Sequence, residues 1–254
     1  MAENTEFVVF LDTSKPLNDE SFAKLFLSAW LGHPMEELRP ERWGSGEPVR
    51  NVISELSLDE LASKWCETPL MFSRVSKPRM KVSLDWRKNK GRDSRPYPWG
   101  LTAWIANNGG RDRVVAFFEL VVTYFRPAFA SATTYAESRR KHFVKVPFLI
   151  NGLQAGTAEE FRGHHVQDTL PGVEWITYFG REVIPRIGET AFLTLPVGRV
   201  ERLSDGFLLI AYEDPSLIGT DEGRAIEQRI VSHFGSDKFF DPHTYGASVL
   251  PIAN

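Results

Sequence analysis

The stretch LPGVEWITYFG, residues 170–180, decides the fold. Proline and glycine open it, Gly180 closes it, and large apolar residues fill the interval. This pattern predicts a buried strand whose two ends are free to turn. Aromatic side chains supply a large share of a core's apolar area, so the stretch is expected to be scaffold. The residues expected in the core are Trp175, Tyr178, Phe179 and Gly180.

The chain before this strand alternates strand and helix patterns. Apolar and β-branched runs predict strands at 6–12, 79–86, 101–107 and 127–138. Helical spacing predicts a helix that begins at Asp19 and ends before Gly32, and a short helix at 57–66 with a Ser57–Glu60 capping box. A third helix is expected between Asp112, as its cap, and Pro127.

The chain after residue 172 repeats this order. A strand at 173–180 and a short helix precede a hairpin, whose arms at 192–203 and 206–214 meet at the turn Ser204-Asp205-Gly206. A helix at 221–235 follows, with Asp221 as its expected cap and Gly235 as its stop. Two βαββα-like halves predict an α+β fold with antiparallel sheets covered by helices. Residues 1–146 and 173–254 form the halves, and 147–172, with four glycines and two prolines, is expected as a connecting loop.

Composition excludes several classes of protein. The net charge of −3 favours neither nucleic acid nor an anionic membrane. Cys66 is the single cysteine, which excludes an intramolecular disulfide and a cysteine-rich zinc cage. The N-terminus lacks the basic start and long apolar run of a secretory signal, and no apolar run reaches the ~18 residues of a membrane span. We therefore expect a cytoplasmic protein without membrane contact.

Signals for catalysis and metal binding are weak. Gly44-Ser45-Gly46 lacks the frame of a nucleophile elbow. His164 and His165 are adjacent, so regular secondary structure would turn them apart, and a solvated loop is the simpler interpretation. We expect no catalytic residue, no metal and no cofactor. The alternative is a hydrolase or metal-dependent enzyme that uses the acidic cluster at 213–222 with His164 or His165.

Charge is distributed unevenly along the chain. Residues 74–95 carry nine lysines or arginines against two acids, whereas residues 201–254 carry nine acids against four basic residues. The basic segment, with aromatic residues nearby, suits either nucleic acid or a solvated hairpin that protects a sheet edge, and we favour the hairpin. The acidic segment suits a basic protein partner, and nuclease domains are such partners because they bind phosphates.

Residues 170–241 resemble a family of bacterial proteins. The run PGVEWITYFGREVIPRIG, the hairpin LTLPVGRVERLSDGFLLIAYEDP and the helix DEGRAIEQRIVSHFG are similar to the immunity protein 52 family, whose members accompany toxins of a restriction-endonuclease fold. A related type VI secretion immunity group is nearly as similar. The resemblance implies an α+β protein that is not an enzyme and whose ligand is a cognate toxin.

This resemblance gives the functional hypothesis. The chain would neutralise a nuclease effector of a type VI secretion system, by occluding its active domain or blocking its active assembly, with no small-molecule substrate and no direct nucleic-acid binding. We expect the toxin to contact an acidic rim formed by Glu213, Asp214, Asp221 and Glu222. A second set of candidate contacts comprises Trp43, Trp86 and Trp99. A nucleic-acid-binding regulator that uses residues 74–99 is the weakest alternative.

Overall fold

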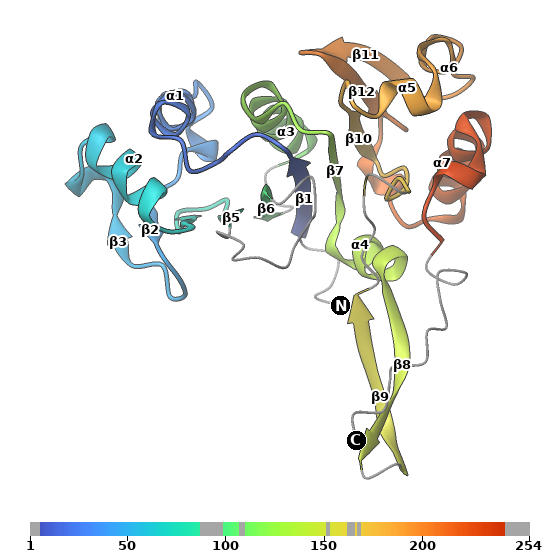
Figure 1. Ribbon diagram of the computed structural model, residues 1–254, viewed down its shortest axis with the longest axis horizontal. Helices are drawn as coiled ribbons and strands as arrows, with labels where there is room; N and C mark the ends of the chain where they lie inside the picture. The colour runs from blue at the N-terminus through green and yellow to red at the C-terminus, as the bar shows by residue number, and fades with distance from the viewer. Residues whose placement is uncertain are drawn as a thin grey trace.

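The structure is a computed structural model that describes residues 6–86, 99–106, 110–150, 153–161, 166 and 169–241. Within these residues, ten strands form one antiparallel sheet (Figure 1). The strands follow one another across the sheet in the order β11 (Arg199–Leu203), β12 (Gly206–Ile210), β10 (Ile176–Phe179), β7 (Phe129–Thr134), β1 (Glu6–Thr13), β6 (Trp99–Ala106), β5 (Met80–Trp86), β4 (Met71–Arg74), β2 (Arg42–Gly44) and β3 (Asn51–Val52).

Strand β10, from the stretch at 170–180, joins the two halves of the chain. It pairs with β7 on one side and with β12 on the other, so strands from both halves belong to a single sheet. The α+β class with antiparallel strands and a helical cover is confirmed. The boundaries at 146 and 172 stay a prediction, because no independent division of the chain tests them.

Helices cover opposite faces of the sheet at its two ends. The first face lies under α1 (Glu20–Leu31), α2 (Leu58–Glu67) and α3 (Arg111–Phe125). Phe26 of α1 packs edge-on against Phe125 of α3 at 4.8 Å, and Trp65 of α2 contacts Phe72 of β4 at 5.9 Å between ring centroids. These interlocked rings form the core of the N-terminal half.

The opposite face of the C-terminal strands is covered by α5 (Ile184–Ile187), α6 (Glu189–Leu193) and α7 (Asp221–Phe234). Phe179 of β10 is paired with Phe129 of β7, which is paired in turn with Asp12 of β1. Residues paired across strands point to the same face, so Phe179 points to the face opposite to that of Leu11. Phe179 contacts Phe192 of α6 at 5.3 Å and Phe234 of α7 at 5.7 Å. The sheet therefore has aromatic cores on both faces, one at each end.

Capping residues place most helix ends where the sequence predicts them. Asp19 accepts a hydrogen bond from the Phe22 amide at the start of α1, and Gly32 follows its last residue. The Ser57–Glu60 capping box is present at α2. Two caps differ by a residue or two. Thr220 rather than Asp221 caps α7, and α3 begins after Gly110 (φ 78°), with Asp112 in the first turn.

The strand predicted at 127–138 is wrong in its second half. It ends at Thr134, and α4 (Tyr135–His142) follows. The Thr134 hydroxyl accepts a hydrogen bond from the Glu137 amide at 3.3 Å and so starts the helix. Small residues in this segment suit either structure, and the cap decides between them.

Part of the predicted connecting loop is a hairpin. Strands β8 (Phe143–Ile150) and β9 (Leu153–Phe161) pair only with each other, and this arm projects away from the main sheet (Figure 1). The glycines and prolines of residues 147–172 suggest a loop. One of these glycines, Gly156, is paired with Phe148 at the point where the register of the two strands shifts. A strand tolerates glycine at such an irregularity, so Gly156 does not interrupt the hairpin.

The predicted hairpin at the C-terminal end is present but shorter. Its turn is at Ser204 (φ 55°) and Asp205, as the sequence indicates. Residues 192–198, expected as strand, instead contain the end of α6 and a turn. Short 3₁₀ turns complete the described chain: η1 (Glu36–Leu38), η2 (Ile53–Glu55), η4 (Pro215–Leu217) and η5 (Ser236–Lys238).

The stretch at 170–180 lies in the core. Trp175, Tyr178 and Phe179 are each 0% exposed, and the Trp175 Nε1 donates to the carbonyl of Tyr212 at 3.0 Å. A Cβ on Gly180 would lie 2.2 Å from the carbonyl oxygen of Pro127, so only glycine fits at the end of this strand. Among the described residues, no helix combines the length and the apolar character needed to cross a bilayer.

Candidate functional site

The acidic rim (Glu213, Asp214, Asp221 and Glu222) runs from the end of β12, through η4, to the first turn of α7. All four side chains are exposed. Asp214 accepts a hydrogen bond from the Ser216 amide at 2.8 Å, which caps η4 and lowers the pKa of this carboxylate. A Cβ on Gly223 would lie 2.2 Å from the carbonyl oxygen of Leu217, so η4 and the start of α7 are packed tightly together.

Arginines lie among the carboxylates of the rim. Glu213 forms ion pairs with Arg111 of α3 and, at 3.3 Å, with Arg199 of β11. Asp221 lies 3.6 Å from Arg224 on its own helix. Exposed pairs of this kind contribute little to stability, but they reduce the local negative charge. Glu222 and Asp214 form no ion pair within the described residues, and the pair of Asp221 is long, so these three carboxylates are more available to an external partner than Glu213.

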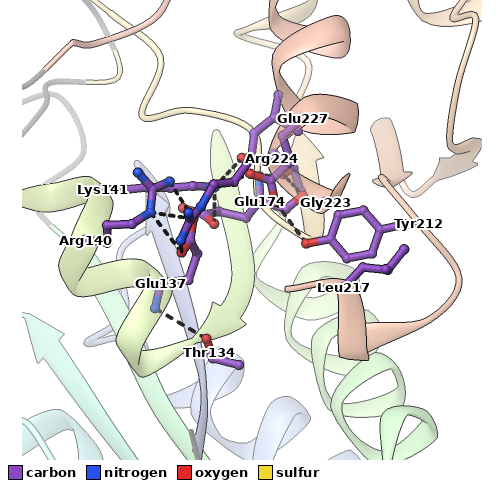
Figure 2. Close-up of polar contacts among 12 residues, drawn as sticks. Thr134, Glu137, Arg140, Lys141, Glu174, Tyr212, Leu217, Gly223, Arg224 and Glu227 are labelled. Atoms are coloured by element: carbon purple, nitrogen blue, oxygen red, sulfur yellow. Dashed lines mark hydrogen bonds and ion pairs between the residues drawn. The ribbon is translucent and has the colours of Figure 1, made fainter. Parts of the chain in front are cut away.

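A cluster of charged side chains with buried carboxylates, the Lys141 cluster, lies where α4 meets α7 (Figure 2). It joins four parts of the chain: α4, the residues just before β10, the residues just after β12, and α7. The side chains of its three carboxylates are only 3–7% exposed. Its members are Glu137, Arg140, Lys141, His142, Glu174, Tyr212, Arg224 and Glu227.

Lys141 lies at the centre and uses all three of its protons. Its Nζ donates to the carbonyl of Val173 at 2.8 Å, to Glu174 at 2.7 Å and to Glu227 at 2.8 Å. Burial disfavours the ammonium ion, but the two carboxylates outweigh this effect and raise the pKa of Lys141. The lysine is therefore charged and connects α4 to both other parts of the cluster.

The two carboxylates on Lys141 have opposite pKa shifts. Burial works against the charge of Glu174, yet Lys141 and His142 (3.4 Å away) lower its pKa to about 2. Burial together with the negative charge of Glu174 raises the pKa of Glu227. The hydroxyl of Tyr212 donates to Glu227 at 3.0 Å and completes its hydrogen bonding.

A second ion pair lies beside the first. Arg140 donates to both oxygens of Glu137 at 2.6–3.0 Å, and Arg224 of α7 approaches the same carboxylate at 3.5 Å. Burial opposes the charge of Glu137, but Arg140 and Lys141 lower its pKa. Three carboxylates therefore face Arg140, Lys141 and Arg224. The near absence of exposure puts them out of a substrate's reach, so the chemistry of this cluster is to fix α7 against α4.

The sequence interpretation missed this cluster because residues 135–138, the start of α4, were assigned to the strand predicted at 127–138 and no helix was expected there. On a helix, Glu137 and Arg140 are three residues apart and Glu137 and Lys141 are four apart, which places them on one face. The run YAESRRKH carries that spacing, so the charge pattern was the available signal.

The three tryptophans proposed as toxin contacts lie far from the rim. Trp43 is half-buried in β2, opposite Phe72 of β4. Trp86 and Trp99 are register partners in β5 and β6, and their side chains lie outside the described residues. Four strand spacings, about 19 Å, separate β12 from β6, and β2 lies farther still. The structure therefore does not bring the two predicted sets of contacts together.

The histidines of the alternative metal site, His164 and His165, lie outside the described residues. Within the described ranges, no group of three His, Cys, Asp or Glu side chains has an arrangement that could hold a metal ion. Cys66 is half-buried on α2, and burial raises the pKa of its thiol.

Comparisons with known proteins give a likeness to solved structures alone. No protein-family model matches the chain, and no curated protein matches it. The fold is similar to that of the Pseudomonas aeruginosa T6SS protein PA0821, with a TM-score of 0.55, 10% sequence identity, and coverage of 92% of this chain and 73% of the other. At this identity the likeness shows a shared fold.

Proposed function

We propose that this chain is an immunity protein that binds and neutralises a cognate antibacterial toxin, a nuclease effector delivered by a type VI secretion system. The observation that carries the proposal is the fold shared over 92% of the chain with a T6SS protein. The resemblance proposed from residues 170–241 points the same way, although no family model matches the chain. In this proposal the chain acts in the cytoplasm, is not an enzyme, and needs no cofactor and no nucleic acid.

The mechanism is stoichiometric binding. A nuclease must present basic groups to hold phosphates, and the carboxylates of the acidic rim can occupy those groups in place of the nucleic acid. Binding would occlude the active domain or block its active assembly. Each charge pair with the toxin contributes about 1–3 kcal/mol if it is desolvated, and under about 1 kcal/mol at an exposed edge.

The Lys141 cluster makes the rim suitable for this role. It holds the first turns of α7 through Arg224 and Glu227, while Gly223 packs on Leu217 of η4. A rigid surface loses little conformational freedom on association, so more of the interaction free energy is retained as affinity.

Charge reversal at the rim tests the proposal. We expect Asp221→Lys with Glu222→Lys to slow association with the cognate toxin domain, and to reduce protection of cells that express that toxin. The matched control is Glu36→Lys with Glu37→Lys, two adjacent exposed acids at the start of η1. Surface plasmon resonance at two salt concentrations measures the on-rates.

The outcomes distinguish an error in the proposed docking surface from an error in the proposed function. Equal on-rates for the rim variant and the control at low salt would exclude the acidic rim and direct attention to Trp43, Trp86 and Trp99. Failure of the unmodified chain to bind the toxin, or to protect cells, would exclude the immunity function itself.

A further inference from the structure

The N-terminal part of the sheet has a face without a helical layer. Along β6, Leu101, Ala103 and Ile105 are buried beneath the helices, whereas Thr102 and Trp104 point to the other face and are only half-buried. Helix α4 contacts β1 and β7 beside this face, whereas the rings that α1, α2 and α3 place against the sheet lie on the other face. Elsewhere the main sheet is covered by aromatic cores, so this open face is an exception.

Apolar side chains are exposed on this face. Five large apolar residues are exposed in the described part of the chain, and two of them, Phe10 (37%) and Val75 (49%), lie here. In the β1–β6 pair, Phe10 is paired with Thr102, and Trp104 is paired with Val8. Phe10 and Trp104 are therefore diagonal neighbours on the same face. Exposed apolar groups with polar surroundings mark interaction surfaces.

A hollow of about 500 Å³ lies at one end of the face, where β4 ends and β5 begins. Trp104 and Val75 supply its apolar walls. Its charged lining comprises three cations and one acid: Arg74, Arg79, Lys81 and Glu6. The lining therefore carries an excess of positive charge.

Two of the cations are held in place by the protein. Arg74 donates to the carbonyls of Glu36 and Arg39 at 3.2 and 3.3 Å and pairs with Glu41 at 3.3 Å. Lys81 pairs with Glu47 and lies over the Trp104 ring at 5.1 Å. Arg79 is exposed, and within the described residues no ion pair is recorded for it. An incoming anion thus meets two cations that already share their charge with Glu41 and Glu47, and the exposed Arg79 beside them.

We propose that this hollow, with the open sheet face beside it, is a docking site for an acidic segment of a protein partner. Carboxylates of the segment pair with Arg79 and Lys81, and its apolar side chains lie on Val75 and Trp104. A polypeptide fits better than a nucleic acid because Lys81 already occupies a face of the Trp104 ring, which a base would need for stacking. This proposal is independent of the proposed function.

NMR titration of the isotope-labelled full chain tests the proposal. The probe is a short synthetic peptide of glutamate interrupted by leucine, and the comparison probe is a thymidine oligonucleotide of equal charge. We expect the peptide to shift the Trp104 indole and the amides of residues 74–81, with an affinity that falls as salt increases. Because this footprint is measured on the unmodified protein, it does not depend on the folding of a variant.

Charge reversal then locates the site. Arg79→Glu with Lys81→Glu should weaken peptide binding about tenfold or more. Arg181→Glu with Arg229→Glu, which makes the same change of charge at exposed positions in the other half, should leave it unchanged. An equal loss in both variants, no shift at Trp104, or a stronger response to the oligonucleotide would overturn the proposal. Competition from a second copy, seen as self-association by sedimentation, would also overturn it.

Discussion

Lys141 illustrates, at the scale of one residue, how this fold accommodates a buried charge. The side chain brings a full positive charge into the protein, where an unpaired ion is costly. Three acceptors surround its Nζ, and two of them are carboxylates from distant parts of the chain. Removing the lysine would leave Glu174 and Glu227 facing each other without compensation.

We expect Lys141→Met to lower the free energy of unfolding by about 3–5 kcal/mol, the usual result of breaking a buried pair from one side. Urea denaturation measures this loss. Lys145→Met, at an exposed position four residues on, is the control and should change stability by less than about 0.5 kcal/mol. A loss below about 1 kcal/mol in Lys141→Met would show that the cluster relaxes around the vacancy.

Trp175 is the residue that most directly connects the two halves. Its ring packs 5.2 Å from that of Phe7 in β1, and its Nε1 bonds to the carbonyl of Tyr212. We expect Trp175→Ala to destabilise the protein by about 3–5 kcal/mol through the cavity and the orphaned carbonyl. Equilibrium unfolding followed by circular dichroism gives the value. A loss under about 1 kcal/mol would contradict the burial described here.

At the scale of elements, α7 is attached to α4 by groups that titrate. Glu174 and Glu137 have lowered pKa values in the folded chain, so they add stability above pH ~4.5 that is lost as the pH falls toward 2. Glu227 has a raised pKa and acts in the opposite direction, because its ionisation costs stability as the pH rises. The larger, lowered shift of Glu174 should dominate acid unfolding.

The expected contribution of Glu174 is about 3 kcal/mol at neutral pH, and it should disappear between pH 4.5 and 2. Urea unfolding of the parent and of Glu174→Gln at several pH values measures it. The variant should be less stable at pH 7 and show a weaker dependence on pH below 4.5. Parallel pH profiles for the two proteins would assign acid sensitivity to other groups.

Elements with caps could be predicted from the sequence, and those set by tertiary pairing could not. The ends of α1 and α2 follow from Asp19, Gly32 and Ser57, because the capping bonds are local. The change from β7 to α4 depends on Thr134, which an alternating pattern of small residues obscures. The β8–β9 arm was hidden because Gly156 suggests a loop, although here it lies beside a bulge.

The candidate site shows the same limit. The acidic rim could be located because its four carboxylates fall within ten residues. The ion pairs of Glu213 with Arg111 and Arg199 could not be foreseen, because they depend on how α3 and β11 pack beside β12. The Lys141 cluster could be foreseen only in its local part, the charge spacing of residues 137–141, because its other members lie up to 90 residues away in sequence.

On the scale of the whole molecule, the shared sheet predicts cooperative unfolding. β10 belongs to the C-terminal half but takes hydrogen bonds from β7, and Trp175 packs on Phe7. We expect a single transition in differential scanning calorimetry, and we expect the fragments 1–146 and 173–254 to lack stable structure when expressed separately. Two resolved transitions, or a fragment with native-like amide dispersion, would instead identify two independent domains.

The two ends of the ten-stranded sheet have a consequence for how the protein behaves at high concentration. A long sheet offers backbone donors and acceptors at each border, which can recruit further chains into fibres. Here one border is β3, only two residues long, and the other is β11, which carries Arg199, Glu201 and Arg202. The short strand at one border and the charged side chains at the other discourage strand-by-strand growth. We therefore expect the protein to resist fibre formation at high concentration.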